Sequence, residues 1–166
     1  MKQIRFSNHL PLILCLIFLL AEGCSDQGSV PTASRTDLLQ ITIHQGIAGR
    51  VWFWEGDFMP MSPSGKITPA VRKVLVYTPT RTDSALRVGY GGFYSHILTR
   101  LVAEATSNDS GFFQVTLQTG RYSLFVKEDT LFYANSFDGG GYIQPATVFT
   151  DSITNVRIDI TYKATF

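Results

Sequence analysis

From about residue 38 onward, apolar and polar residues alternate along the chain, and this alternation is the strongest constraint on its fold. A strand with one buried face repeats every second residue, whereas a helix repeats about every 3.6 residues. The alternating runs are also rich in β-branched and aromatic residues, which favour strands. They lie at 39–55, 71–78, 97–107, 111–118, 120–128, 131–136, 145–150 and 154–163. The run at 97–107 has a helical alternative because it contains Ala and Glu.

Clusters of turn-forming residues separate these runs, at SNDSG (107–111), QTG (118–120) and DGGG (138–141). Many short strands separated by closely spaced turns are typical of a β-sandwich. We therefore expect a single all-β sandwich of seven or eight strands over residues 38–166. The segments 56–70 and 79–96 are expected as long irregular loops, where binding residues often lie.

The segments 111–118 and 120–128 are expected to form a hairpin, with Gly111 and Gly120 supplying the positive φ that tight turns need. Side chains two residues apart share a face of a strand, so a shift of one residue would expose the apolar face. We expect these side chains to lie in the core: Phe113, Val115, Leu117, Tyr122, Leu124 and Val126.

The first 23 residues have the order of a secretory signal peptide: Lys2 and Arg5, then an apolar run at 10–21, then small residues. The apolar run is shorter than the roughly 20 residues that span a bilayer, and it ends at Glu22. Cleavage after residue 23 would leave Cys24 as the one remaining cysteine. Two interpretations stay open for Cys24, namely acylation and a free thiol.

The segment LLAEGC (19–24) resembles the lipobox of bacterial lipoproteins, in which the cysteine takes a diacylglycerol and becomes the N-terminus. This resemblance implies a lipid anchor at Cys24, and Ser25 after it implies delivery to the bacterial outer membrane. Acyl chains contribute about 0.8 kcal/mol per buried CH₂ to membrane binding. The polar residues 24–37 would form a flexible tether between the membrane and the domain.

Loss of residues 1–23 would change the formal net charge from +1 to zero. A neutral chain without a basic patch gives no indication of a nucleic-acid partner.

The segment NDSGFFQVTLQTGRYSLFV (108–126) resembles the carboxypeptidase regulatory-like domain, a transthyretin-type β-sandwich. GIAGRVWFWEGDFMP (46–60) is similar to the opening strand of this family in lipoproteins of the Bacteroidota. The resemblance extends over about residues 46–164. It implies a non-catalytic accessory or interaction module that presents loops to a protein or glycan partner, and some related folds bind carbohydrate.

The sequence contains no recognisable catalytic or metal-binding motif, so we expect no enzyme, cofactor or metal. Ser95 and His96 are adjacent and face opposite sides of a strand, which excludes a nucleophile–base pair. The terminal segment from Tyr162 to Thr165 resembles the Tyr-Arg-Gly-Ser signature of transthyretin-type hydrolases only in outline. Asn108, Asp109 and Asp138 could bind calcium, but turn chemistry explains them more simply.

Two groups of aromatic residues are candidate ligand-binding sites. Trp52 and Trp54 share one face of a strand, where they could stack on sugar rings or be covered in the fold. GYGGFY (89–94) combines flexible glycines with the contact area of Tyr90, Phe93 and Tyr94. The alternative for this segment is a loop that folds back to cap the sandwich.

Overall fold

The computed structural model describes residues 40–61 and 64–166. The signal peptide expected at 1–23, Cys24 and the tether expected at 24–37 lie outside the described residues. Within these residues no helix has the length and apolar character needed to cross a membrane.

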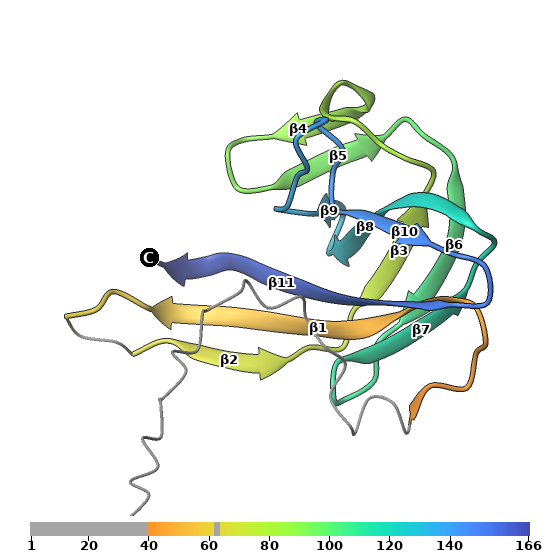
Figure 1. The fold of residues 1–166 in the computed structure, drawn as a ribbon. Helices are drawn as coiled ribbons and strands as arrows, with labels where there is room; N and C mark the ends of the chain where they lie inside the picture. The colour runs from red at the N-terminus through yellow and green to blue at the C-terminus, as the bar shows by residue number, and fades with distance from the viewer. Residues whose placement is uncertain (1–39, 62–63) are drawn as a thin grey trace, which may run out of the picture.

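The described chain is all-β, with 59% of its residues in strands that form two facing sheets (Figure 1). In the four-stranded sheet, β1 (Gly46–Asp57) lies in the centre. It pairs in parallel with β11 (Ile153–Thr165) and, along its other edge, antiparallel with β2 (Lys66–Pro69) and β7 (Phe112–Thr116). The expected all-β sandwich class is thereby confirmed.

The second sheet has seven strands. In spatial order six of them are β4 (Ala85–Val88), β5 (Phe93–Ile97), β9 (Leu131–Tyr133), β8 (Gly120–Glu128), β3 (Lys73–Tyr77) and β6 (Leu101–Thr106). The seventh, β10 (Pro145–Val148), pairs with the first half of β8. The described residues thus contain eleven strands rather than seven or eight.

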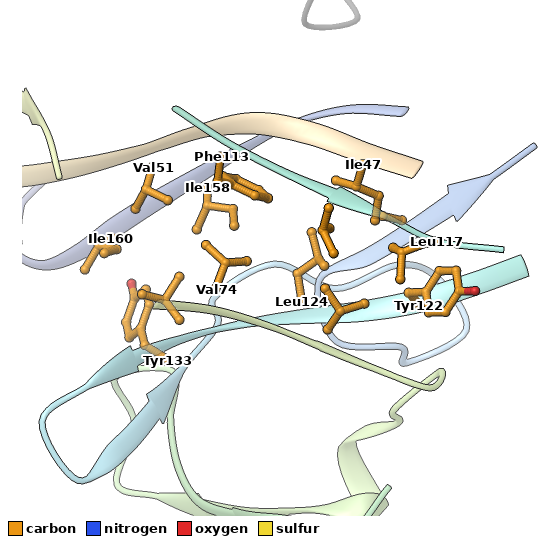
Figure 2. Packing of buried hydrophobic residues seen from close by; sticks show 14 of the residues in the cluster. Ile47, Val51, Val74, Phe113, Leu117, Tyr122, Leu124, Tyr133, Ile158 and Ile160 are labelled. Carbon is orange, nitrogen blue, oxygen red and sulfur yellow. The ribbon is translucent and has the colours of Figure 1, made fainter. Parts of the chain in front are cut away.

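The main core fills the space between the two sheets (Figure 2). Val51, Phe113 and Ile158 extend into it from the four-stranded sheet, and Val74 and Leu124 meet them from the other. The six side chains expected in the core from alternation all belong to this cluster, each less than 10% exposed. The expected buried faces of 111–118 and 120–128 are therefore confirmed.

The expected hairpin between 111–118 and 120–128 is wrong. β7 pairs with β1 in the four-stranded sheet, whereas β8 pairs with β3, β9 and β10 in the other sheet. The connecting residues 117–119 cross from one sheet to the other, and the Tyr122 hydroxyl donates to the carbonyl of Gln118 across this turn (2.8 Å). Apolar faces directed into one core are compatible with either arrangement, so alternation does not distinguish a hairpin from a crossing.

The expected long loops are also corrected. The segment 56–70 contains the end of β1 and the short strand β2, and 79–96 contains β4 and most of β5. The segment 97–107 is not a helix, because its residues 101–106 form β6.

A second, smaller hydrophobic cluster lies on the opposite side of the seven-stranded sheet. Leu75 and Phe125 are cross-strand partners there. Leu75 points away from the main core because its neighbours Val74 and Val76 point into it. Tyr94 of β5 and Ile143 cover them. This cluster fixes the positions of β4, β5 and the segment after β9, which build the site described next.

Candidate ligand-binding cleft

A cleft of about 340 Å³ lies where the β4–β5 loop, the segment after β9 and the end of β11 meet. In Figure 1 the C-terminal end of β11 and the β4–β5 loop lie on the same side of the molecule. The described residues that line the cleft are Arg87, Tyr90, Gly91, Gly92, Tyr133, Asn135, Phe137, Thr161, Tyr162, Ala164 and Phe166. Most of them are aromatic or carry an uncharged polar group.

The β4–β5 loop forms one wall and is held by backbone contacts. Gly92 has a φ of 78°, and a Cβ there would lie 2.9 Å from the carbonyl oxygen of Ala134. The close approach allows the N–H of Ala134 to donate to the carbonyl of Gly92 (3.0 Å). The Arg87 guanidinium donates to the carbonyl of Tyr90 (2.9 Å), while the Tyr90 side chain is 98% exposed. The loop therefore presents Tyr90 from a fixed base.

Polar side chains connect β9 with β11 at the floor of the cleft. The Tyr133 hydroxyl accepts a hydrogen bond from the backbone N–H of Thr161 (3.0 Å). The Asn135 amide N–H donates to the Thr161 hydroxyl (2.9 Å). The amide oxygen of Asn135 has no hydrogen-bond partner among the described residues, so it is available to a ligand.

Tyr162 of β11 connects the floor to an ion pair at the end of β8 in the seven-stranded sheet. Its hydroxyl donates to Glu128 Oε2 (2.8 Å), and Glu128 Oε1 pairs with the Arg72 guanidinium. Burial, followed by the hydrogen bond and negative charge of Glu128, raises the pKa of Tyr162 to about 12. Tyr162 is therefore neutral near pH 7, and its hydroxyl group donates a hydrogen bond to Glu128.

The three aromatic residues of the 89–94 segment have different surroundings. Tyr90 lines the cleft. Phe93 is half-buried behind it, with its ring centroid 5.1 Å from that of Tyr133 and 5.0 Å from that of Tyr162. Tyr94 is 1% exposed in the second cluster, so it has no surface to offer to a ligand. Burial raises the pKa of Tyr94, whose hydroxyl has no hydrogen-bond partner within the described residues.

Trp52 and Trp54 lie on the outer face of the four-stranded sheet, opposite the core-facing Phe53. The Arg157 guanidinium lies over both indole rings, 5.5 Å and 5.9 Å from their centroids. Arg157 also pairs with Asp159, which accepts a hydrogen bond from the Trp54 indole N–H (2.7 Å). The guanidinium therefore occupies part of the space over these rings that a stacking sugar would need.

The acidic and amide residues considered for calcium hold turns. Asp138 Oδ1 accepts from the backbone N–H groups of Gly140 and Tyr142, both at 2.9 Å. Asn108 Oδ1 does the same for Ser110 and Phe112, both at 3.0 Å. These contacts are those expected of turn chemistry. Across the described ranges, no three His, Cys, Asp or Glu residues come together in a way that could hold a metal ion.

Sequence reasoning missed Arg87, Asn135, Phe137 and Phe166 as lining residues. Phe137 precedes the glycine-rich segment 138–141, much as Tyr90 lies among the glycines of 89–92, and this shared pattern was the available signal. The other three lie at a strand, a loop and the last residue, which only the fold brings together. Comparison of the chain with family models, with curated proteins and with solved structures found no match.

Proposed function

We propose that this protein is a non-catalytic, membrane-anchored lipoprotein that uses one end of its β-sandwich as an accessory or interaction module. The observation that carries the interaction role is the cleft, where three exposed aromatic side chains line the surface beside a polar floor. Tyr90 is 98%, Phe166 66% and Phe137 44% exposed. Aromatic rings that remain exposed beside a concave surface are typical of recognition sites.

The carboxypeptidase regulatory-like, transthyretin-type identity remains part of this proposal. Two facing sheets support it, as does the burial of Phe113 and Tyr122 in one core. The sequence segments at 46–60 and 108–126 that carry the resemblance form β1 and the β7–β8 crossing.

The position of the cleft suits a protein anchored through Cys24 to the bacterial outer membrane. The described chain enters β1 at Gly46, whereas the cleft lies near the far end of that strand, where Ala164 pairs with Gly56. Ten residues of strand separate these points by about 33 Å. An anchor at the N-terminal side therefore leaves the cleft accessible to a partner.

The anchor is tested by Cys24→Ala in the full-length chain. We expect the wild-type protein to fractionate with membranes and the variant to be released, because acyl chains would supply the membrane affinity. Retention of the variant in membranes would contradict acylation at Cys24.

A carbohydrate is the partner class that the cleft favours. Sugar rings bind to aromatic faces through their C–H groups, while amides and hydroxyls bond their oxygens, and the cleft combines both. Trp54 should report binding, since its ring contacts that of Phe166 (centroids 6.0 Å apart).

The carbohydrate role is tested by titrating the protein with a panel of neutral and acidic oligosaccharides while recording tryptophan fluorescence. We expect at least one glycan to give a saturable change that Tyr90→Ala removes. Tyr90 is almost fully exposed, so this substitution leaves the fold intact. A flat response across the panel would exclude a carbohydrate, and co-purification of a membrane protein with the intact lipoprotein would then support a protein partner.

A further inference from the structure

The described residues that line the cleft include one charged side chain. Arg87 is the charged side chain among the described residues that line it, and these residues include no Asp or Glu. Glu128, which accepts a hydrogen bond from the cleft-lining Tyr162, forms an ion pair with Arg72. Arg87 therefore places a positive charge at the wall formed by β4 and the β4–β5 loop.

Arg87 is exposed and has no acidic partner among the described residues. No described Asp or Glu forms an ion pair with it. One of its terminal nitrogens donates to the carbonyl of Tyr90, which holds the guanidinium within its own loop. The remaining N–H donors of the planar group can bind a carboxylate in a bidentate manner.

The aromatic residues define where such a carboxylate would lie. Tyr90 is in the loop that follows Arg87 of β4, and Phe137 and Phe166 line the cleft with them. A sugar ring placed against an aromatic face carries its substituents outward from the ring edge. A carboxylate on the ring can then reach Arg87 while ring hydroxyls reach the free amide oxygen of Asn135.

We propose that the cleft binds glycans whose sugar rings carry a carboxylate, with Arg87 as the residue that determines this specificity. The proposal rests on the carbohydrate-binding function proposed above. The new element is a negative charge on the ligand, because binding to the aromatic residues alone does not require a charged sugar.

The test compares two probes that differ only in that charge: an oligogalacturonate and its fully methyl-esterified form. Binding to the full-length Cys24→Ala chain is measured by calorimetry and tryptophan fluorescence. We expect the acid to bind about tenfold or more tightly than the ester, because a charge-assisted bidentate contact is much stronger than a neutral one. The difference should shrink as ionic strength rises, since Arg87 is exposed.

Three variants locate the effect. Arg87→Gln should bind acid and ester equally, and Arg87→Lys should keep a reduced preference for the acid because it retains charge without the planar fork. Arg100→Gln is the matched control: Arg100 is equally an exposed arginine but does not line the cleft, so it should behave as wild type. Circular dichroism of each variant checks that the fold is retained.

The possible outcomes separate the two proposals. Equal binding of acid and ester by the wild type would overturn the acidic specificity and leave a carbohydrate site in place. An acid preference that persists in Arg87→Gln, or is lost in Arg100→Gln, would overturn the role of Arg87. Binding of neither probe would overturn the acidic specificity, while the wider glycan panel decides on the carbohydrate function.

Discussion

Replacement of Gly111 by alanine tests the close approach of β7 to β1 in the four-stranded sheet most sharply. Gly111 has a φ of 76°, and a Cβ there would press against the carbonyl oxygen of Val51 in β1. That carbonyl accepts a hydrogen bond from Ala70 (3.0 Å), and the Val51 N–H donates to the carbonyl of Gly111 (2.9 Å). The substitution therefore strains the backbone and disturbs both hydrogen bonds of Val51.

The magnitude follows from these contacts. A left-handed conformation costs an L-residue about 1–2 kcal/mol. Weakening two backbone hydrogen bonds costs about 1 kcal/mol each. Alanine also restricts the unfolded chain, which returns about 0.4–1 kcal/mol. We expect Gly111→Ala to lower the free energy of unfolding by about 2–3.6 kcal/mol.

Urea unfolding followed by the fluorescence of Trp52 and Trp54 measures this loss, with an unchanged slope as the sign that the unfolded state is the same. Gly139→Ala is the matched control because a Cβ at Gly139 meets nothing within 4 Å. We expect that variant to be as stable as wild type or slightly more stable. Equal stability of the two variants would refute the close approach of β7 to β1.

Further predictions concern the core, Tyr162, and the outer face of the four-stranded sheet that carries Trp52 and Trp54 (the tryptophan face). Phe113→Ala should lower the free energy of unfolding by about 3–5 kcal/mol because Phe113 is 2% exposed, whereas the exposed Phe149→Ala should change it by less than about 0.5 kcal/mol in urea unfolding. Since the folded-state pKa of Tyr162 is raised from 10.0 to about 12, its contribution to stability is present below pH 10 and is lost between pH 10 and pH 12. Tyr162→Phe should remove that part of the loss of stability at alkaline pH. It should also remove one tyrosine that ionises near pH 12 from the absorbance titration. A dependence of stability on pH identical to that of wild type would contradict the raised pKa. Arg157→Ala should uncover the indole rings of Trp52 and Trp54 and increase their quenching by acrylamide, and unchanged quenching would mean that the guanidinium does not cover them.

Alternation in the sequence correctly identified which side chains of 111–128 are buried, but it did not identify which strands pair with each other. Phe113 and Leu117 alternate because one face of their strand meets the core, and this local property is visible in the residues. Pairing depends on distant segments: Ile47 lies beside Val115 and also beside Thr154, more than 100 residues away. No local pattern distinguishes a strand that returns to its neighbour from one that crosses to the opposite sheet.

The short strands were missed for a related reason. β4 has one buried residue, Ala85, followed by the exposed Leu86, Arg87 and Val88, so it shows no alternation.

The second hydrophobic cluster covers the outer side of the seven-stranded sheet, which removes the polar face that alternation requires. Leu75 and Phe125 are buried there although their neighbours in sequence are buried too.

The candidate site was only partly predictable. Tyr90 was identified because it lies in a glycine-rich segment, and loops usually run over the surface. Asn135 and Phe166 come from segments about 30 residues apart that meet only because β9 and the end of β11 are joined by Tyr133 and Thr161. Tyr94, next to Phe93 in the same segment, is buried because adjacent residues of a strand face opposite sides.

Mapping of backbone amide chemical shifts tests most directly the claim that the cleft, and not the tryptophan face, is the binding site. The isotope-labelled, full-length Cys24→Ala chain is titrated with an oligogalacturonate. We predict that the largest shifts fall on three segments: 87–92, 133–137 and 161–166. Shifts centred on Trp52, Trp54 and Arg157 would contradict the account.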